Sequence, residues 1–149
     1  MEKVTITKVN EVSVHDVTPL FDAYRQFYAQ QPDLAGARDF LVARLTKNES
    51  VIFLATENGQ PVGFAQLYPS FSSLSMKRVW ILNDLFVTMS ARGHGVGTAL
   101  LRECQRLAIE TGAKELALET MKTNLSAQRL YEELGWRRDE VFYRYNLPV

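Results

Sequence analysis

The sequence has little of several things that would mark a particular class of protein. It contains one cysteine, Cys104, so no disulfide can form within the chain, and its two histidines show no metal-ligand spacing. Seventeen basic residues balance seventeen acidic ones, which leaves no net charge to attract nucleic acid or an anionic membrane surface. No apolar run approaches the length of about 18 residues that a membrane-spanning helix requires. Redox, metal, nucleic-acid and membrane functions are therefore not expected.

The length of the chain bounds its organisation. At 149 residues it can bury one sizeable core, and we expect a single domain over residues 1–149. The stretch from Met1 to Thr5 has no apolar core of the signal-peptide kind, which predicts a cytoplasmic protein. A small, locally charged ligand is the partner that this composition favours.

The spacing of apolar residues predicts the secondary structure. Segments with helical spacing alternate with β-favouring runs, and turn residues such as Asn58-Gly59 separate them. Helices are expected at residues 12–28, 35–46, 98–111 and 124–134. Strands are expected near residues 4–9, 51–56, 62–68, 79–87 and 115–118, and through Val141, Tyr143 and Tyr145. This order predicts an α/β fold of the mixed α+β kind, with a twisted, mostly antiparallel sheet of about six or seven strands and helices on both faces.

A glycine-rich segment, Arg92-Gly93-His94-Gly95-Val96-Gly97, lies between a strand-like run and a predicted helix. Glycine has no Cβ, so the backbone can bend there and an anion can approach several N–H groups. The N-terminus of the following helix adds unpaired N–H groups and partial positive charge. The segment therefore predicts a binding site for a diphosphate.

Two common phosphate-binding loops do not match this segment. A GxGxxG dinucleotide loop requires glycine or alanine five residues after its first glycine, but those positions after Gly93 and Gly95 hold threonine and leucine. A P-loop requires lysine and then serine or threonine after its last glycine, but Gly97 is followed by Thr98 and alanine. A kinase or dehydrogenase stays an alternative that nucleotide binding would test.

The residues around the loop resemble the acetyl-CoA motif of the GNAT superfamily of N-acetyltransferases. The likeness covers Leu85-Phe86-Val87 and the segment from Ala91 to Leu101. Residues 124–136, which include Tyr131, are similar to a second motif of that family. The two motifs cover about the C-terminal half of the chain, while the first half matches in the order of its elements. The resemblance implies a GNAT-like fold and an acyltransferase that uses acetyl-CoA as cosubstrate and no metal.

The resemblance also implies where acetyl-CoA binds. The diphosphate is expected on the glycine loop beside Arg92, and the pantetheine arm along the strand edge near Phe86 and Val87. The N–H of Val87 is a candidate to stabilise negative charge on the carbonyl oxygen. The full set expected to contact the cosubstrate is Leu85, Phe86, Val87, Arg92, Gly93, His94, Gly95, Val96, Gly97, Thr98, Asn124 and Ala127.

Acetyl transfer to an amine requires two proton transfers. The amine arrives mostly as an ammonium and must lose a proton, and the departing sulfur benefits from a proton donor. By resemblance Tyr131 is that acid. Asp84, Glu119 or solvent reached through a water chain is the expected base, while Asn83 orients a water or holds the amine. Since neighbouring strand residues face opposite sides, Asn83 and Asp84 can share one site only if a bulge intervenes.

The acceptor is expected to be a primary amine of a small molecule, amino-acid-like or polyamine-like, that attacks directly in a ternary complex. Polyamine-type members resemble residues 81–87 closely but carry glutamate where this chain has Asn83, which leaves the polyamine assignment open. The candidate acceptor residues are Asp22, Phe27, Tyr28, Asn83 and Glu119. The alternatives are an acetyltransferase of a protein amine and a noncatalytic CoA-binding domain. The resemblance to the family, together with the alternating apolar residues of the predicted C-terminal strand, predicts a homodimer.

Simple structural roles compete with several of these assignments. Cys104 shares an apolar helix face and is expected to be a core thiol instead of an acyl carrier. Tyr131 fits an apolar stripe, and Asn124 fits a helix cap. His94 could be an exposed loop imidazole, and Asp84 a buried carboxylate satisfied by nearby donors.

Overall fold

The computed structural model describes residues 3–149, so Met1 and Glu2 of the stretch considered for a signal peptide lie outside the described residues. The chain divides into two compact units, of which the first ends at Glu119 and the second is Thr120–Val149. Within residues 3–149, no helix is both long enough and apolar enough to cross a membrane.

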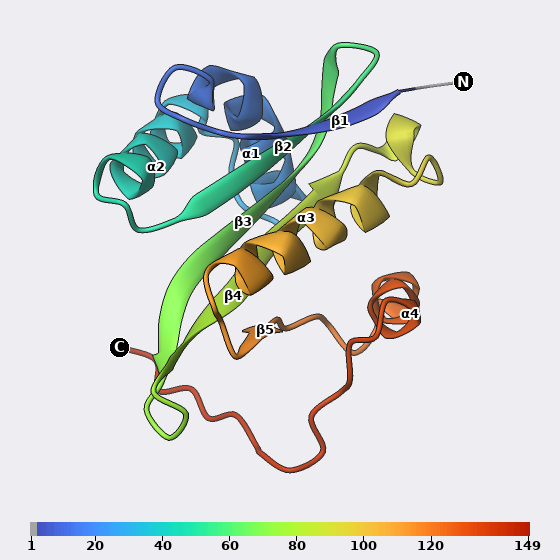
Figure 1. The fold of residues 1–149 in the computed structure, drawn as a ribbon. Helices are drawn as coiled ribbons and strands as arrows, with labels where there is room; N and C mark the ends of the chain where they lie inside the picture. The colour runs from blue at the N-terminus through green and yellow to red at the C-terminus, as the bar shows by residue number, and fades with distance from the viewer. Residues whose placement is uncertain (1–2) are drawn as a thin grey trace. The chain divides into compact units, whose positions relative to one another are not determined.

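The first unit contains a sheet of five strands in the order β1-β2-β3-β4-β5 (Figure 1). The strands are β1 Val4–Lys8, β2 Val51–Glu57, β3 Gln60–Ser72, β4 Lys77–Val87 and β5 Glu115–Ala117. The helices are α1 Val14–Phe27, α2 Leu34–Thr46 and α3 Val96–Glu110, with a short 3-10 helix, η1, at Met89–Ala91. Neighbouring strands are antiparallel except β4 and β5, which are parallel. The expected mixed, mostly antiparallel sheet is confirmed, with five strands and not the larger number predicted.

The second unit contains the helix α4, Leu125–Glu133, and the C-terminal stretch. Asn124 caps α4, because its side-chain oxygen accepts a hydrogen bond from the N–H of Ala127 at 3.3 Å. The strand expected through Val141, Tyr143 and Tyr145 is wrong: residues 138–149, all within the described part of the chain, form no strand. These three side chains are 79–92% exposed, so the alternating pattern buries no apolar surface. A strand also requires hydrogen bonds to a neighbouring strand.

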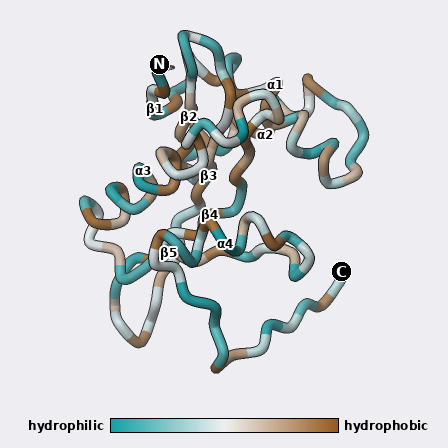
Figure 2. Tube along the Cα trace, turned by 90° about the vertical axis from the view of Figure 1, so that its right-hand side faces the viewer, coloured by the Kyte–Doolittle hydropathy of each residue, from teal (hydrophilic) through white to brown (hydrophobic). Residues whose placement is uncertain are grey.

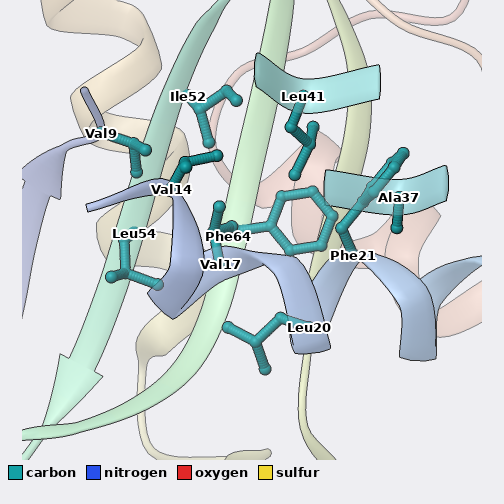
Figure 3. Packing of buried hydrophobic residues seen from close by; sticks show 10 residues of the cluster. All are labelled: Val9, Val14, Val17, Leu20, Phe21, Ala37, Leu41, Ile52, Leu54 and Phe64. Carbon is teal, nitrogen blue, oxygen red and sulfur yellow. The ribbon is translucent and has the colours of Figure 1, made fainter. Parts of the chain in front are cut away.

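One face of the sheet is covered by α1 and α2 (Figure 1). Val14, Val17 and Phe21 fall on one side of α1 because residues three and four apart share a helix face. Phe64 of β3 meets the ring of Phe21 edge-on, with 6.0 Å between ring centres. Figure 3 shows the ten residues of this core: Val9, Val14, Val17, Leu20, Phe21, Ala37, Leu41, Ile52, Leu54 and Phe64.

The opposite face is covered by α3, which packs along all five strands (Figure 1). Hydrophobic and hydrophilic positions alternate along this helix, as Figure 2 shows. On this side Trp80 of β4 donates its indole N–H to Oγ1 of Thr111, just past the end of α3, at 2.8 Å. Cys104 is buried here, and burial raises the pKa of its thiol to about 12. The predicted core thiol is confirmed.

Candidate active site

A bulge in β4 sets the direction of its polar residues. In the pairing of β3 with β4, Gln66 lies opposite Asp84, and the next residue, Leu67, lies opposite Leu82. Asn83 is therefore an extra residue on β4, and Leu82 and Asp84 face opposite sides of the sheet although they are two positions apart. The bulge needed for Asn83 and Asp84 to act together is present.

Asp84 is a buried carboxylate, 4% exposed, that accepts hydrogen bonds from two side chains. Gln66 Nε2 donates to Oδ2 at 2.6 Å, and Asn83 Nδ2 donates to Oδ1 at 3.0 Å. The Tyr24 hydroxyl of α1 donates to the carbonyl oxygen of Asn83 at 3.4 Å, and it also interacts with Asp84. These contacts explain how the interior holds a carboxylate, although none of these three side chains carries a positive charge.

The surroundings of Asp84 change its acidity. Burial raises the pKa of Asp84 above its ordinary value of 3.8, and the interactions of Asp84 with Gln66, Tyr24 and Asn83 offset only part of this rise. A carboxylate with a raised pKa binds a proton more readily, which suits a general base. Burial, reinforced by the charge of Asp84, also raises the pKa of Tyr24 and raises that of Tyr68 to about 12.

The C-terminal half of β4 has an open edge. On one side β3 pairs with β4 as far as Val87, but on the other β5 pairs with it only from Val79 to Ile81. Among residues 3–149, no strand pairs with that second edge from Leu82 onward. An extended molecule that carries amides could therefore pair with the backbone there, beside Asp84.

The glycine loop follows β4 and η1 and leads directly into α3. Gly93 and Gly95 both have a φ of 81°, a left-handed conformation that glycine adopts without strain. A Cβ on either residue would meet no other atom of the described chain within 4 Å, so there is open space beside the loop. Gly95 is the N-cap of α3, and no side chain of the described residues caps this helix end. The loop and the N–H groups of the first turn of α3 therefore fit an anion such as a diphosphate.

Two side chains of the loop have partners in the same unit. Arg92 Nε donates to the carbonyl oxygen of Val87 at 3.3 Å, which connects the loop to the end of β4. His94 Nδ1 lies 2.9 Å from Oε2 of Glu57 at the end of β2, a contact that the sequence did not predict. Both contacts hold the loop against the sheet.

A family model supplies the observation that decides the class of the protein. The model described as the acetyltransferase (GNAT) family matches residues 16–136, a range that contains β4, the glycine loop and α4. This chain belongs to the GNAT family. It is therefore an N-acetyltransferase, and membership of the family implies acetyl-CoA as the cosubstrate.

Individual relatives agree with this GNAT assignment. The chain is 52% identical over 133 residues to the uncharacterized N-acetyltransferase YhfO of Bacillus subtilis, covering 89% of each chain. It is 35% identical over 91 residues to the D-amino-acid N-acetyltransferase HPA3 of Saccharomyces cerevisiae, covering 61% of this chain and 56% of the yeast protein. A crystal structure of a probable acetyltransferase superposes with a TM-score of 0.93 at 42% identity, covering 97% of both chains. The α+β GNAT fold is thereby confirmed.

The candidate acceptor residues of this GNAT protein lie in the first unit. Phe27 and Tyr28 lie at the exposed end of α1, and the ring of Tyr28 meets that of Tyr24 at 5.1 Å. Asp22 is buried, and its Oδ1 accepts from Arg25 Nη1 at 2.8 Å and from the backbone N–H at position 33 at 3.1 Å. Glu119 is exposed, two residues after β5. Asn83 is exposed at the bulge.

The predicted acid lies in the second unit. Tyr131 is partly buried in α4, and its ring packs against that of Trp136 with 5.8 Å between centres. Its carbonyl oxygen also accepts the backbone N–H of Trp136 at 3.0 Å. These contacts hold the tyrosine within its own unit. The cap expected at Asn124 is confirmed by its bond to Ala127.

Sequence reasoning missed Gln66 and gave Tyr24 no part in the chemistry. Gln66 is fully buried in β3 between Ala65 and Leu67, and its Oε1 has no hydrogen-bond partner among the described residues. An amide in the middle of an apolar strand was the available signal, because buried polar groups need partners. The partner itself could not be named, because it depends on the register of β3 against β4.

Proposed function

We propose that this enzyme transfers the acetyl group of acetyl-CoA to the primary amine of a small molecule, in a complex that holds both substrates together. The observation that carries the proposal is the position of a buried carboxylate beside the open edge of β4. One strand thus offers an edge for the cosubstrate and, at Asp84, a group that can accept a proton from the amine.

The residues after Leu82 would bind the cosubstrate. The open space beside Gly93 and Gly95 and the uncapped start of α3 support binding of the diphosphate by residues 92–98. The unpaired edge supports binding of the pantetheine arm along residues 85–87. Asn124 and Ala127 join this set because of the motif that they share with the family. Bound there, acetyl-CoA supplies a thioester that an amine can attack.

Asp84 and Tyr131 transfer different protons in this reaction, and Asn83 transfers none. Asp84 accepts the proton that the ammonium must lose before nitrogen attacks the thioester carbon. The new N–C bond forms as the C–S bond breaks, and the sulfur takes both electrons of that bond and a proton from Tyr131. The acylated nitrogen then loses its second proton, which restores the phenol of Tyr131 and leaves a neutral amide. Asn83 cannot take a proton, and it holds the amine by hydrogen bonding.

An amino-acid-like acceptor is the class that we favour. The yeast relative is a D-amino-acid N-acetyltransferase, which supports this class over a polyamine. Phe27, Tyr28 and Glu119 would contact the part of the acceptor away from its amine. Asp22 belongs to the same set, although its bonds to Arg25 and to the start of α2 would compete with an acceptor. A cytoplasmic homodimer is the form in which we expect the enzyme to act.

A panel of amines tests this function. The purified protein is incubated with acetyl-CoA and D-amino acids, L-amino acids, diamines or aminoglycosides, and free thiol and acetylated product are measured. We expect turnover on an amino acid, and a loss of about 100-fold or more in Asp84→Asn. Gln105→Ala, on the exposed side of α3, is the matched control. Binding of CoA without turnover on any amine would contradict the proposal and favour a noncatalytic CoA-binding domain.

A further inference from the structure

The glycine loop, residues 92–97, cannot fix its own shape. Gly93 and Gly95 both have a φ of 81°, in a region that glycine enters and leaves freely, so their backbone is not locked there. A loop that its ligand must order binds that ligand more weakly, because ordering costs conformational entropy. Binding of a diphosphate is therefore strengthened by neighbouring residues that hold the loop in place before CoA arrives.

Support for the loop comes from the hairpin of β2 and β3, which lies outside the two sequence motifs. The backbone N–H of Thr88 donates to the carbonyl oxygen of Val62 at 2.8 Å, which fixes the start of the connection from β4 to α3. Gly63 leaves room for the first residue of α3, because a Cβ at position 63 would lie 3.2 Å from Cγ1 of Val96. The hairpin therefore lies against both ends of the segment 88–96.

Glu57, the last residue of β2, reaches the middle of the loop. Its two carboxylate oxygens lie 2.9 and 3.1 Å from Nδ1 of His94, and only 11% of the Glu57 side chain is exposed. Because a carboxylate only accepts hydrogen bonds, Nδ1 of His94 is the donor. Ile52 and Leu54 belong to the core under α1 and α2, so the alternation of β2 directs Glu57 to the face that α3 covers.

We propose that Glu57 is a positioning residue for acetyl-CoA, which holds the glycine loop in its binding shape through His94. The inference rests on the proposed function, which places the diphosphate on this loop. His94 is held to β2 by Glu57, and Arg92 is held to β4 by the carbonyl oxygen of Val87. The loop is thus attached to two different strands, and its N–H groups keep one arrangement while they wait for the diphosphate. Glu57 acts through His94 and does not touch the cosubstrate.

The negative charge of Glu57 gives the proposal a distinctive sign. A carboxylate near a diphosphate repels it, so if Glu57 acted on CoA through its charge alone, removing it would strengthen binding. If Glu57 holds the loop, removing it weakens binding, because the loop must then be ordered when CoA binds. A holding contact and a simple charge therefore predict opposite changes in affinity.

Glu57→Ala tests the proposal, with the Kd of CoA measured by calorimetry. We expect Kd to rise about tenfold. On the panel amine with the highest turnover, KM for acetyl-CoA should rise by a similar factor with kcat unchanged, because binding is weakened and the chemical step is not. An unchanged or lower Kd would overturn the proposal.

Gln60→Ala is the matched control, because Gln60 is the exposed residue that pairs with Glu57 across the hairpin. It should bind CoA as wild type does. An equal loss of affinity in Gln60→Ala would show that any change in the hairpin has this effect, and would contradict a specific role for Glu57.

A double-mutant cycle tests whether Glu57 acts through His94. In a His94→Ala background, Glu57→Ala should change Kd by less than about twofold, because the contact is already absent. If the two losses of affinity simply multiply, Glu57 acts independently of His94, and the proposal is wrong.

Measurements without turnover separate this inference from the proposed function. In the free protein, NMR order parameters of the backbone N–H groups of residues 92–98 should be lower in Glu57→Ala than in wild type, and unchanged in Gln60→Ala. Equal order parameters in Glu57→Ala and wild type would refute the holding contact. If wild type binds CoA but acetylates no panel amine, the proposed function fails while the Kd values and the order parameters still judge the role of Glu57.

Discussion

Gln66 and Asp84 lie directly opposite each other on β3 and β4, with the amide nitrogen of one 2.6 Å from a carboxylate oxygen of the other. The same pairing of strands that builds the sheet therefore also positions the proposed base. Any change in register would separate the two side chains, so stability and catalysis depend on one contact.

Gln66→Leu should weaken both properties. It removes a donor from a buried carboxylate, which we expect to destabilise the fold by about 1–3 kcal/mol in urea unfolding. It also removes a hydrogen bond that lowers the pKa of Asp84, so the acidic limb of the rate profile should move to higher pH. Gln105→Leu, an exposed change on α3, should do neither. A variant as stable as wild type would contradict the importance of this bond.

Asp84→Asn should change how stability depends on pH. Because the folded pKa of Asp84 lies above its ordinary value of 3.8, its contribution is fully present below that value and is lost as pH rises through the folded pKa. The variant should therefore gain stability relative to wild type as pH rises, and lose activity. Rotation of the Gln66 amide would satisfy the new side chain. Urea unfolding at a series of pH values measures the difference, and a pH-independent difference would refute the expectation.

Gly95→Ala should weaken CoA binding beyond its effect on folding. A side chain at a φ of 81° costs about 1 kcal/mol and also occupies the open space beside the loop. Gly59→Ala is the matched control, because Gly59 has a φ of 82° in the β2–β3 hairpin. We expect similar losses of stability, but an affinity for CoA reduced about tenfold or more only in Gly95→Ala. Equal affinities by calorimetry would place the diphosphate elsewhere.

Tyr131→Phe should lower kcat with little effect on the fold. The ring still packs on Trp136, while the proton donor for the departing sulfur is gone. We expect a loss of about 100-fold in kcat and an unchanged unfolding midpoint. Tyr145→Phe, at a side chain that is 90% exposed, provides the comparison. A fully active Tyr131→Phe would leave packing as the only role of this tyrosine.

Local patterns predicted much of this protein. Apolar spacing located α1 and α3, and the glycine loop before α3 was recognised from residue types alone. The surroundings of Asp84 could not be predicted, because the bulge at Asn83 depends on how β3 pairs with β4 and not on periodicity within either strand. The prediction of a C-terminal strand was wrong for the opposite reason. Residues 141–145 have the alternation of apolar and polar side chains that a strand shows, but they neither pair with another strand nor become buried. The spacing of apolar residues is a property of one segment, whereas strand pairing depends on two segments at once.

The bulge in β4 also bears on how this enzyme can diversify. Asn83 is additional to the ladder of β3 and β4, so the alternation of the strand on either side of it does not depend on which side chain it carries. Mutation at the exposed position 83 would therefore leave the strand pairing intact, but it would change the hydrogen bond that Asn83 donates to the neighbouring carboxylate. A change at this position would therefore act on two things together, the proposed contact with the acceptor and the surroundings of the proposed base.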